Sequence, residues 1–401
     1  MTDTTPSLPT LEDLDLAGKR VLVRCDFNVP IRDGEITDDL RIRSAVPTIE
    51  ALLDRGARLI LCSHLGRPKG KVVEELRLAP VGRRLAQLLG RPVETLDSVV
   101  GDEAMAASMS NADVILLENL RFEPGETTND PDLADALAQL ADVYVNDAFG
   151  AAHRAHASVV GVAERLPSAA GLLLQDEVAK LEKVLHEPQH PYVAILGGAK
   201  VSDKLGVIGN LLERVDQLCI GGAMAFTLLK ALGHDVGRSL VEDDRLSEVE
   251  GVLKQAADRG VEILLPSDVV AAEAPEAGAA HETVDLSDIG DRMGVDIGPA
   301  SAEHFGRTIR AAKTVLWNGP MGIFEIDDYA AGTRAVAEAV VDATRAGAYS
   351  VVGGGDSAAA LKQLGLSDEV SHLSTGGGAS LELLEGRELP GIAVLRQKGN
   401  R

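Results

Sequence analysis

One pattern of hydrophobic and polar positions recurs along the chain: a short run rich in Val, Ile and Leu, then a glycine or polar turn, then a stretch with helical spacing. In the first half the apolar runs are "RVLVRCDF", "ARLILCSH", "DVILLENL" and "DVYVNDAF". In the second half they are "PYVAILGG", "QLCIGG", "VEILLPSD", "KTVLWNGP" and "YSVVGGGD". Continuous apolar strands that alternate with helices predict parallel sheets covered by helices on both faces, which is a doubly wound α/β fold.

The number of strand–helix units fits two sheets better than one, and a length of 401 residues also favours two or more domains. A leucine-spaced helix is predicted over residues 171–187, ending before Pro188. We therefore expect two doubly wound parallel-sheet (Rossmann-like) domains, residues 1–170 and 188–385, joined by this helix as a hinge. The run "LPGIAVLRQKGN" predicts a further short strand, and "AAEAPEAGAAHE" predicts an exposed excursion without ligand chemistry.

The charge of the chain limits its partners. Lys and Arg number 39 and Asp and Glu 62, which gives a net charge of −23. Proteins that bind nucleic acid or anionic membranes usually carry the opposite sign, so we expect neither partner. An anionic ligand must then be held by a local basic cluster inside an acidic molecule.

The chain has the features of a cytoplasmic protein. Its N-terminus is acidic where a signal peptide would be basic and then apolar, and no apolar run approaches the length needed to cross a bilayer. The three cysteines, Cys25, Cys62 and Cys219, lie far apart and form no C-x-x-C pair. Such cysteines are typical of buried thiols in a reducing compartment.

The stretch "AILGGAKVSDK" predicts a phosphate site although the Walker pattern is absent. Gly197 and Gly198 end an apolar strand and let the backbone approach an anion closely. The helix expected next offers free N–H groups and a positive dipole end. Lys200 and Lys204 are four residues apart, so we expect them on one helical face, pointing toward the same phosphates. The alternative is a solvated lysine face.

The stretch "VVGGGDSAAALKQLG" repeats this arrangement with the glycines of residues 353–355. Asp356 and Ser357 open the next helix, and Asp356 is either an N-cap or a carboxylate for Mg²⁺ that neutralises phosphate oxygens. The pattern G-x-G-x-x-[GA] of dinucleotide sites also occurs here. The acidic residue expected about 20 positions later is missing, which argues against a dehydrogenase.

Two more loops complete the predicted nucleotide site. "STGGGASLELLEG" carries another glycine run into a helix start, at residues 376–378. "WNGPMGIFE" brings two glycines, a proline and Glu325, whose carboxylate can accept hydrogen bonds from ribose hydroxyls. Each loop by itself is ordinary, but together they predict a purine nucleotide site of the non-Walker kind.

In the first half, different side chains follow the predicted strands. Asp26 and Asn28 suit contacts with hydroxyl groups or water. Arginine presents a planar fork that matches phosphate and carboxylate oxygens, so a group of arginines in this acidic chain predicts a small polyanion as ligand. The basic candidates are His64, Arg67, Arg121 and Arg154, with Arg41 in the first turn of a helix behind an expected Asp cap.

These motifs together resemble one family. "RCDFNVP", "SHLGRP", "ENLRF", "HRAHAS", "GGAKVSDK", "MGVDIGP", "WNGPMGIFE" and "GGGDSAAA" are similar to those of the phosphoglycerate kinases, in that order across nearly the whole chain. The resemblance implies reversible transfer of a phosphoryl group from 1,3-bisphosphoglycerate to MgADP, giving 3-phosphoglycerate and MgATP in glycolysis and gluconeogenesis. It also implies a monomer, a glycerate-binding N-terminal domain, a nucleotide-binding C-terminal domain and in-line transfer on hinge closure. The chain end, residues 386–401, would return to the first domain.

The resemblance also implies a role for each matched residue. Asp26 and Asn28 would contact the hydroxyl and carboxyl end of the glycerate, while Arg41, Lys200 and Gly377 would act on the transferred group. The 3-phosphate would be bound by His64, Arg67, Arg121 and Arg154. The nucleotide would be bound by Lys204, Gly294, Asn318, Glu325, Gly354, Gly355, Asp356 and Ser357, with Asp356 on Mg²⁺.

Two alternatives stay open at this point. An acyl-phosphate kinase acting on acetate needs no 3-phosphate pocket, and the arginines of the first half argue against it. A catalytically silent relative kept as an interaction protein would be expected to have lost Arg41, Lys200 or Asp356, and all three are present.

Overall fold

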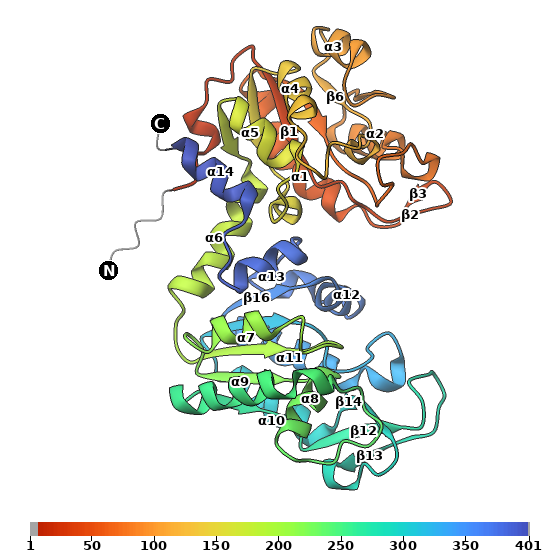
Figure 1. Ribbon diagram of the computed structural model, residues 1–401, viewed down its shortest axis with the longest axis vertical. Helices are drawn as coiled ribbons and strands as arrows, with labels where there is room; N and C mark the ends of the chain where they lie inside the picture. Colours follow the sequence, from red (N-terminus) through yellow and green to blue (C-terminus); the bar gives the residue numbers. More distant parts are fainter. Residues whose placement is uncertain (1–6, 400–401) are drawn as a thin grey trace. The chain divides into compact units, whose positions relative to one another are not determined.

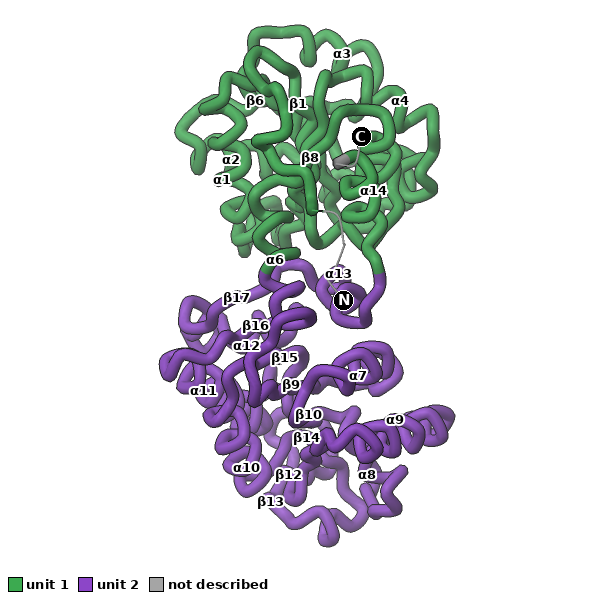
Figure 2. The backbone as a smooth tube through the Cα atoms, turned by 90° about the vertical axis from the view of Figure 1, so that its left-hand side faces the viewer, with its two compact units in different colours: residues 1–179, 388–401 green, residues 180–387 purple. Residues whose placement is uncertain are grey.

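The computed structural model describes residues 7–399, whose helices and strands are labelled in Figure 1. The chain forms two compact units, shown in two colours in Figure 2. Unit 1 is residues 1–179 and 388–401, and unit 2 is residues 180–387. The boundary at residue 179 falls inside α6 (Leu172–His186), the long helix expected over residues 171–187. Within residues 7–399, no helix is both long and apolar enough to cross a membrane.

Unit 1 contains a six-stranded sheet in which every neighbouring pair is parallel. Apart from one short edge strand, its strands are almost wholly buried, which explains their continuous apolar sequences. Side chains of β1 and β4 form one core with apolar side chains of α1 and α2. The order across the sheet is β5 (Glu94–Thr95), β6 (Val114–Leu116), β4 (Arg58–Cys62), β1 (Arg20–Arg24), β7 (Val143–Asn146) and β8 (Ser168–Ala170).

Several helices and one hairpin complete unit 1. The short antiparallel pair β2 (Ile31–Arg32) and β3 (Glu35–Ile36) lies between β1 and the first helix in the chain. The helices are α1 (Leu40–Asp54), α2 (Ala79–Leu89), α3 (Asp102–Ser108), α4 (Pro131–Gln139), α5 (Val162–Arg165) and α14 (Pro390–Gly399).

Unit 2 is built on a second six-stranded parallel sheet. One face of this sheet packs on α10 and α11, and the single tryptophan, Trp317, is fully buried in that core. The order is β11 (Glu262–Leu264), β10 (Gln217–Ile220), β9 (Tyr192–Leu196), β15 (Thr314–Asn318), β16 (Tyr349–Gly353) and β17 (His372–Leu373). The helices are α7 (Leu205–Leu211), α8 (Met224–Ala231), α9 (Leu246–Arg259), α10 (Pro299–Arg310), α11 (Ala331–Arg345), α12 (Gly355–Gln363) and α13 (Gly378–Leu384). The prediction of two doubly wound parallel α/β sheets is confirmed.

Unit 2 also contains an antiparallel sheet that the sequence patterns did not indicate. Its strands, in order, are β13 (His281–Asp285), β12 (Asp268–Ala272) and β14 (Met293–Ile297). The stretch "AAEAPEAGAAHE", expected to be an excursion, includes the connection between β12 and β13. The segment was missed because β13 is mostly exposed and therefore lacks an apolar run.

The strand predicted near the chain end is wrong, because residues 390–399 form α14. The segment contains β-branched residues, but Leu389, Ile392 and Leu395 are buried at intervals of three, which is the spacing of one helical face. Pro390 at the first position suits a helix start. The helix contacts β8 and α5 within unit 1 (Figure 1). The first six and the last two residues lie outside the described part of the chain.

Candidate active site

In unit 1 the residues expected to bind an anion follow strands that are neighbours in the sheet. Strands β6, β4, β1 and β7 are adjacent, and the strand order reverses between β1 and β7. Ligands of open α/β sheets bind at the carboxyl ends of strands near such a reversal. Asp26 and Asn28 follow β1, His64 and Arg67 follow β4, Arg121 lies in a short 3₁₀ helix after β6, and Arg154 follows β7.

Side chains from two strand ends hold the loop that follows β4. The N–H of Gly66 donates to Asn28 Oδ1 at 2.9 Å, and Arg121 Nη1 donates to the Gly66 carbonyl at 2.6 Å. Asn119 Oδ1 accepts the N–H groups of Leu65 and Arg121, each at 3.1 Å. The loop that carries the predicted phosphate ligands is therefore fixed before any ligand binds. Sequence reasoning did not single out Asn119, since an amide in "ENLRF" has no spacing that distinguishes it.

Arg41 and Asp26, assigned to different parts of the substrate, form an ion pair with each other. Arg41 is the second residue of α1, as expected from the sequence. The expected cap is only partly right: Asp39 occupies the N-cap position but its side chain pairs with Arg84 at 2.7 Å, while Asp38 accepts the first helical N–H at 2.9 Å. Arg41 is thus placed at this edge of the sheet by its pair with Asp26.

Arg121, Arg154 and Arg24 form a concentrated positive cluster in unit 1. Arg121 is 7% exposed, and its Nε–H has no hydrogen-bond partner within residues 7–399. Burial and the charges of Arg154 and Arg24 lower the pKa of Arg121 to about 10. Burial and the same arginines hold the pKa of His64 well below its usual value. A buried guanidinium N–H without a partner destabilises the folded protein, and repulsion between like charges adds to this cost. A bound anion would reduce both costs, so the cluster is suited to binding one.

In unit 2 the glycine turn after β9 lies where the strand order reverses between β9 and β15. The N–H of Gly197 donates to the Asn318 carbonyl at 3.0 Å. A Cβ on Gly197 would lie 2.0 Å from the Pro320 carbonyl oxygen, so this glycine is required by packing within the chain. Gly198 has a φ of 112° with no atom within 4 Å of its Cβ position. Gly198 is therefore the position that leaves room for a ligand at the backbone.

The expectation that Lys200 and Lys204 stack on a helix is wrong. Helix α7 begins at residue 205, so both lysines lie in the turn before it, with Lys204 at the N-cap position. Glu242 holds this turn, accepting hydrogen bonds from the N–H of Ser202 at 3.0 Å and from its hydroxyl at 2.6 Å. Lys200 is exposed, whereas Lys204 is buried and donates from Nζ to Asn318 Oδ1. Burial lowers the pKa of Lys204 to about 8.

The glycine turn after β16 is built over Asn318. The amide Nδ2 of Asn318 is buried without a hydrogen-bond partner in the described residues, and it lies 3.1 Å from the Cβ position of Gly354. Gly354 has a φ of 91° and is the N-cap of α12. The hydroxyl of Ser357 is buried and accepts the N–H of Gly319 at 2.6 Å. Asp356 is in the first turn of α12 and is therefore not its N-cap.

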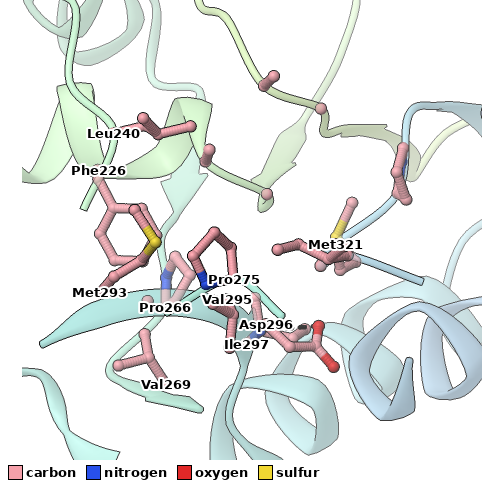
Figure 3. Close-up of a pocket in the computed structure, with 18 of the residues that line it drawn as sticks. Phe226, Leu240, Pro266, Val269, Pro275, Met293, Val295, Asp296, Ile297 and Met321 are labelled. Carbon is pink, nitrogen blue, oxygen red and sulfur yellow. Dashed lines mark hydrogen bonds between the residues drawn. The ribbon is translucent and has the colours of Figure 1, made fainter. Parts of the chain in front are cut away.

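A cavity of about 300 Å³ lies beside these turns (Figure 3). Phe226, Leu240 and Met293 lie on one side of it and Met321 on the other. A Cβ on Gly294 would lie 2.0 Å from the Phe226 ring, so only glycine fits there without a shift. A cavity of this size with mainly apolar walls suits a flat aromatic base.

Three carboxylates line the same cavity. Asp296 is buried, accepts the N–H groups of Ile297 at 2.9 Å and Gly332 at 2.7 Å, and has its pKa raised to about 7 by burial. Its oxygens are thus used within the chain. Glu325 and Asp356 are exposed at the cavity, where they can meet polar or cationic groups of a ligand.

The predicted nucleotide residues lie at or near the cavity, whereas two residues assigned to the transferred group do not line it. Gly294, Glu325 and Asp356 line the cavity, and Asn318 connects Lys204 to the turn at Gly354. Gly355 is the first residue of α12, next to Asp356. Lys200 and Gly377 are outside the cavity lining, and Gly377 is the N-cap of α13, after the edge strand β17.

Sequence reasoning missed the apolar part of the cavity. Phe226 and Met321 carried no signal, because apolar residues in a helix or loop are usually core. Pro275 also lines the cavity, so the stretch "AAEAPEAGAAHE" does contribute to it, against expectation. In unit 1, sequence reasoning also passed over Arg24. Its signal was the unusual position of a charged residue inside the apolar run "RVLVRCDF".

The chain thus has two parallel α/β units, one with an arginine cluster and the other with an apolar cavity beside glycine turns at its strand ends. This combination defines a nucleotide-dependent phosphotransferase. The pattern of the family described as phosphoglycerate kinase matches residues 11–387. Phosphoglycerate kinase of Rubrobacter xylanophilus is 59% identical over 391 residues, covering 97% of this chain and 98% of that one. That of Thermosipho africanus is 55% identical over 394 residues, with the same coverage of 97% and 98%.

A solved structure of phosphoglycerate kinase from Coxiella burnetii is 42% identical, with a TM-score of 0.88 over 98% of this chain and 100% of that chain. The chain therefore belongs to the phosphoglycerate kinase family. Its activity is phosphoryl transfer with a carboxyl group as acceptor, in glycolysis.

Proposed function

We propose that unit 1 binds 3-phosphoglycerate and 1,3-bisphosphoglycerate, that unit 2 binds ADP and ATP, and that the phosphoryl group passes directly between them. One observation carries the assignment of unit 1: Arg121 is buried with an unpaired N–H among other cations. A small polyanion would satisfy that donor and neutralise its neighbours. In unit 2, the apolar cavity beside buried Lys204 supports a base next to phosphates.

Charge and position support the roles that we propose within unit 1. His64, Arg67, Arg121 and Arg154 would bind the standing 3-phosphate, since they follow adjacent strands and carry the needed donors. Asp26 and Asn28 would contact the hydroxyl and carboxyl end. Asn28 Oδ1 already accepts from Gly66, which leaves its amide group as donor. Arg41 would leave its pair with Asp26 to reach the transferred group.

In unit 2, the cavity at Gly294 would hold the base, and Glu325 would meet the ribose. The phosphates would be held by Lys204, by Asn318 and by the turn that consists of Gly354, Gly355, Asp356 and Ser357. Asp356 is an exposed carboxylate at the cavity, which fits a magnesium site made of one carboxylate plus phosphates. When bound, Mg²⁺ would neutralise charge on the phosphate oxygens. Lys200 and the helix start at Gly377 would stabilise the group in transit.

This set of residues suits the chemistry. The attacking atom is an oxygen of the glycerate carboxylate or of an ADP phosphate, and both are ionised near pH 7. No general base is needed, so catalysis reduces to in-line positioning and stabilisation of charge on the moving phosphoryl group. Arg41, Lys200 and the backbone N–H groups of the glycine turns can supply that stabilisation.

We further propose that α6 acts as a hinge between the glycerate-binding and nucleotide-binding domains, because direct transfer requires the two substrates to meet. We also propose a cytoplasmic monomer. The three cysteines are free and buried, which suits a reducing compartment.

A trapping assay tests the substrate assignment. The protein is incubated with 3-phosphoglycerate, MgATP and hydroxylamine, and the acyl hydroxamate formed from 1,3-bisphosphoglycerate is followed, with acetate as a parallel substrate. We expect product from 3-phosphoglycerate only. Product from acetate would reject the 3-phosphate pocket. Silence with both, from folded protein that binds MgADP, would reject the proposed reaction.

Two substitutions test the division of roles. Lys200→Ala should mainly lower kcat, and Arg67→Ala should mainly raise the KM for 3-phosphoglycerate, because one side chain acts on the transferred group and the other on the standing phosphate. A kcat of Lys200→Ala within about twofold of the wild type, or ~0.4 kcal/mol, would contradict the role of Lys200.

A further inference from the structure

Arg24 is the largest charged side chain wholly buried in unit 1, and the residue roles proposed above leave it unused. It is the last residue of β1 and is 0% exposed. Each nitrogen of its guanidinium has a partner: Nε donates to Ser158 Oγ at 2.9 Å, Nη1 to the Cys25 carbonyl, and Nη2 lies 3.1 Å from His64 Nδ1. Arg24 therefore joins the strand to the loop that carries His64.

The contact with His64 has only one chemical interpretation. A guanidinium has N–H donors and no acceptor, and it keeps its proton under all ordinary conditions. Nδ1 of His64 must then be the acceptor, so it carries no proton. The ring can hold its one proton only on Nε2, and a second proton on Nδ1 would place two donors against each other.

We propose that Arg24 is a positioning residue that holds His64 as the neutral tautomer protonated on Nε2, so that His64 donates a hydrogen bond to the substrate phosphate rather than supplying a charge. The identity of the acceptor rests on the glycerate site proposed above. The positioning itself rests on the geometry at Arg24. His64 would then bind the phosphate in the same form throughout the pH range where histidines usually titrate.

The rest of the network explains why Arg24 can remain charged in the core. Ser158 Oγ, which accepts from Arg24, donates its own proton to Glu126 Oε1 at 2.7 Å, and the Ser158 N–H donates to Glu126 Oε2 at 3.1 Å. Glu126 is 0% exposed. Burial tends to raise the pKa of Glu126, but His156, whose Nδ1 lies 3.5 Å from Glu126 Oε1, and the charge of Arg24 lower it overall. The balancing carboxylate thus lies on the Ser158 side of Arg24, and His64 is on the other.

The charges that act most on the His64 ring all oppose its protonation. They are Arg24 from β1, Arg121 from the turn after β6, Arg154 from the loop after β7 and Arg41 from α1. Together with burial they hold the pKa of His64 well below its usual value. The electrostatics and the hydrogen-bond geometry therefore favour the same neutral form.

The direct test is ¹⁵N NMR of the intact protein with labelled histidine, from about pH 5.5 to about pH 8, with His64 assigned through the His64→Gln variant. We expect the Nε2-protonated neutral ring at every pH, since nitrogen shifts distinguish the two tautomers and the cation. A cationic ring, or a proton on Nδ1, anywhere in that range would overturn the proposal. This measurement needs no substrate and no substitution of Arg24.

A kinetic test separates positioning from a general loss of structure. Arg24→Gln replaces the charged donor to Nδ1 by a shorter neutral amide and removes a positive charge near the ring, so His64 should titrate in the variant. We therefore compare the KM of the variant for 3-phosphoglycerate with that of the wild type at each pH. The ratio of the two KM values should rise by about tenfold from low to high pH, because the neutral ring of the variant loses one hydrogen bond to the charged phosphate. A merely structural effect would give a ratio that is constant with pH, and that result would overturn the proposal. Arg24→Gln protein that fails to fold leaves the NMR experiment to decide.

Arg58→Gln is a matched control. Arg58 lies on β4, at the opposite end of the sheet from His64, and donates to the Ser110 carbonyl at 2.8 Å. Its loss removes one side-chain hydrogen bond of unit 1 without touching the ring, so the KM ratio should not vary with pH.

If the ring is the expected tautomer but 3-phosphoglycerate neither binds nor reacts, the positioning by Arg24 stands and the proposed substrate is rejected.

Discussion

Lys204 provides the sharpest test of the nucleotide site, because its burial makes a signed prediction about pH. The side chain is 8% exposed, its Nζ donates to Asn318 Oδ1, and burial lowers its pKa to about 8. If Nζ meets a nucleotide phosphate, the anion stabilises the charged amine and raises the pKa again in the complex. Nucleotide binding must then be coupled to proton uptake above about pH 7.

The size of the effect follows from the pKa. At pH 9.5 a free amine with a pKa of about 8 is charged in only ~3% of molecules, whereas at pH 7 it is charged in ~90%. If the pKa in the complex returns to about 10.5, the affinity for ADP should fall about 30-fold between these pH values, or about 2 kcal/mol. The terminal phosphate of ADP loses its last proton with a pKa of about 6, so it is mostly ionised from pH 7 upward and changes the affinity far less than Lys204 does.

Isothermal titration calorimetry of ADP measures both quantities. Titrations in buffers of different ionisation enthalpy should give about half a proton taken up per nucleotide at pH 8. Lys204→Arg is the matched control, since a guanidinium stays charged throughout and should bind ADP with little pH dependence. An affinity that is constant between pH 7 and about pH 9.5, with no proton uptake, would refute the contact between Lys204 and the phosphates.

Two further predictions concern neighbouring residues of unit 2. Glu242→Gln weakens the hydrogen bonds that hold the turn at Ser202, so Lys200 is less well placed and kcat should fall about tenfold in steady-state kinetics. The melting temperature, measured by calorimetry, should change less than a core substitution would change it. An unchanged kcat would show that Glu242 does not position Lys200. Gly294→Ala places a Cβ 2.0 Å from the Phe226 ring, so the ring must shift into the cavity and ADP affinity should fall about tenfold by equilibrium titration. Affinity equal to that of the wild type would mean that the base does not occupy this cavity.

Much of the fold could be predicted because a parallel strand is buried on both faces and leaves a continuous apolar run. β1, β4, β9 and β15 follow this rule. β13 does not, because an antiparallel strand at a sheet edge can be mostly polar. The C-terminal helix α14 was misassigned because its β-branched residues outweighed a three-residue spacing that only a packed structure makes plain.

The candidate site divides along similar lines. Charged and glycine residues after strands could be predicted, since all parallel strands end at the same edge of a sheet. The contact of Lys204 with Asn318 could not, because the two residues are 114 positions apart and meet only because β9 and β15 are neighbours. Phe226 and Met321 could not be distinguished from core residues. Glu242 acts through the backbone of a turn, which leaves no pattern in the sequence.

The two units differ in how their cations respond to pH, and this difference leads to one more prediction. In unit 1 the charge comes from arginines: even buried Arg121 keeps a pKa of about 10, and His64 contributes a hydrogen bond in its neutral form. In unit 2, burial lowers the pKa of Lys204 to about 8. Between about pH 6.5 and about pH 9, kcat/KM for 3-phosphoglycerate at saturating nucleotide should therefore be nearly flat, while kcat/KM for ADP at saturating 1,3-bisphosphoglycerate should decline above about pH 8. If kcat/KM for both substrates declined above about pH 8, the titrating group would belong to the shared chemical step. If kcat/KM for 3-phosphoglycerate declined near pH 6.5 to 7, His64 would bind as a cation after all.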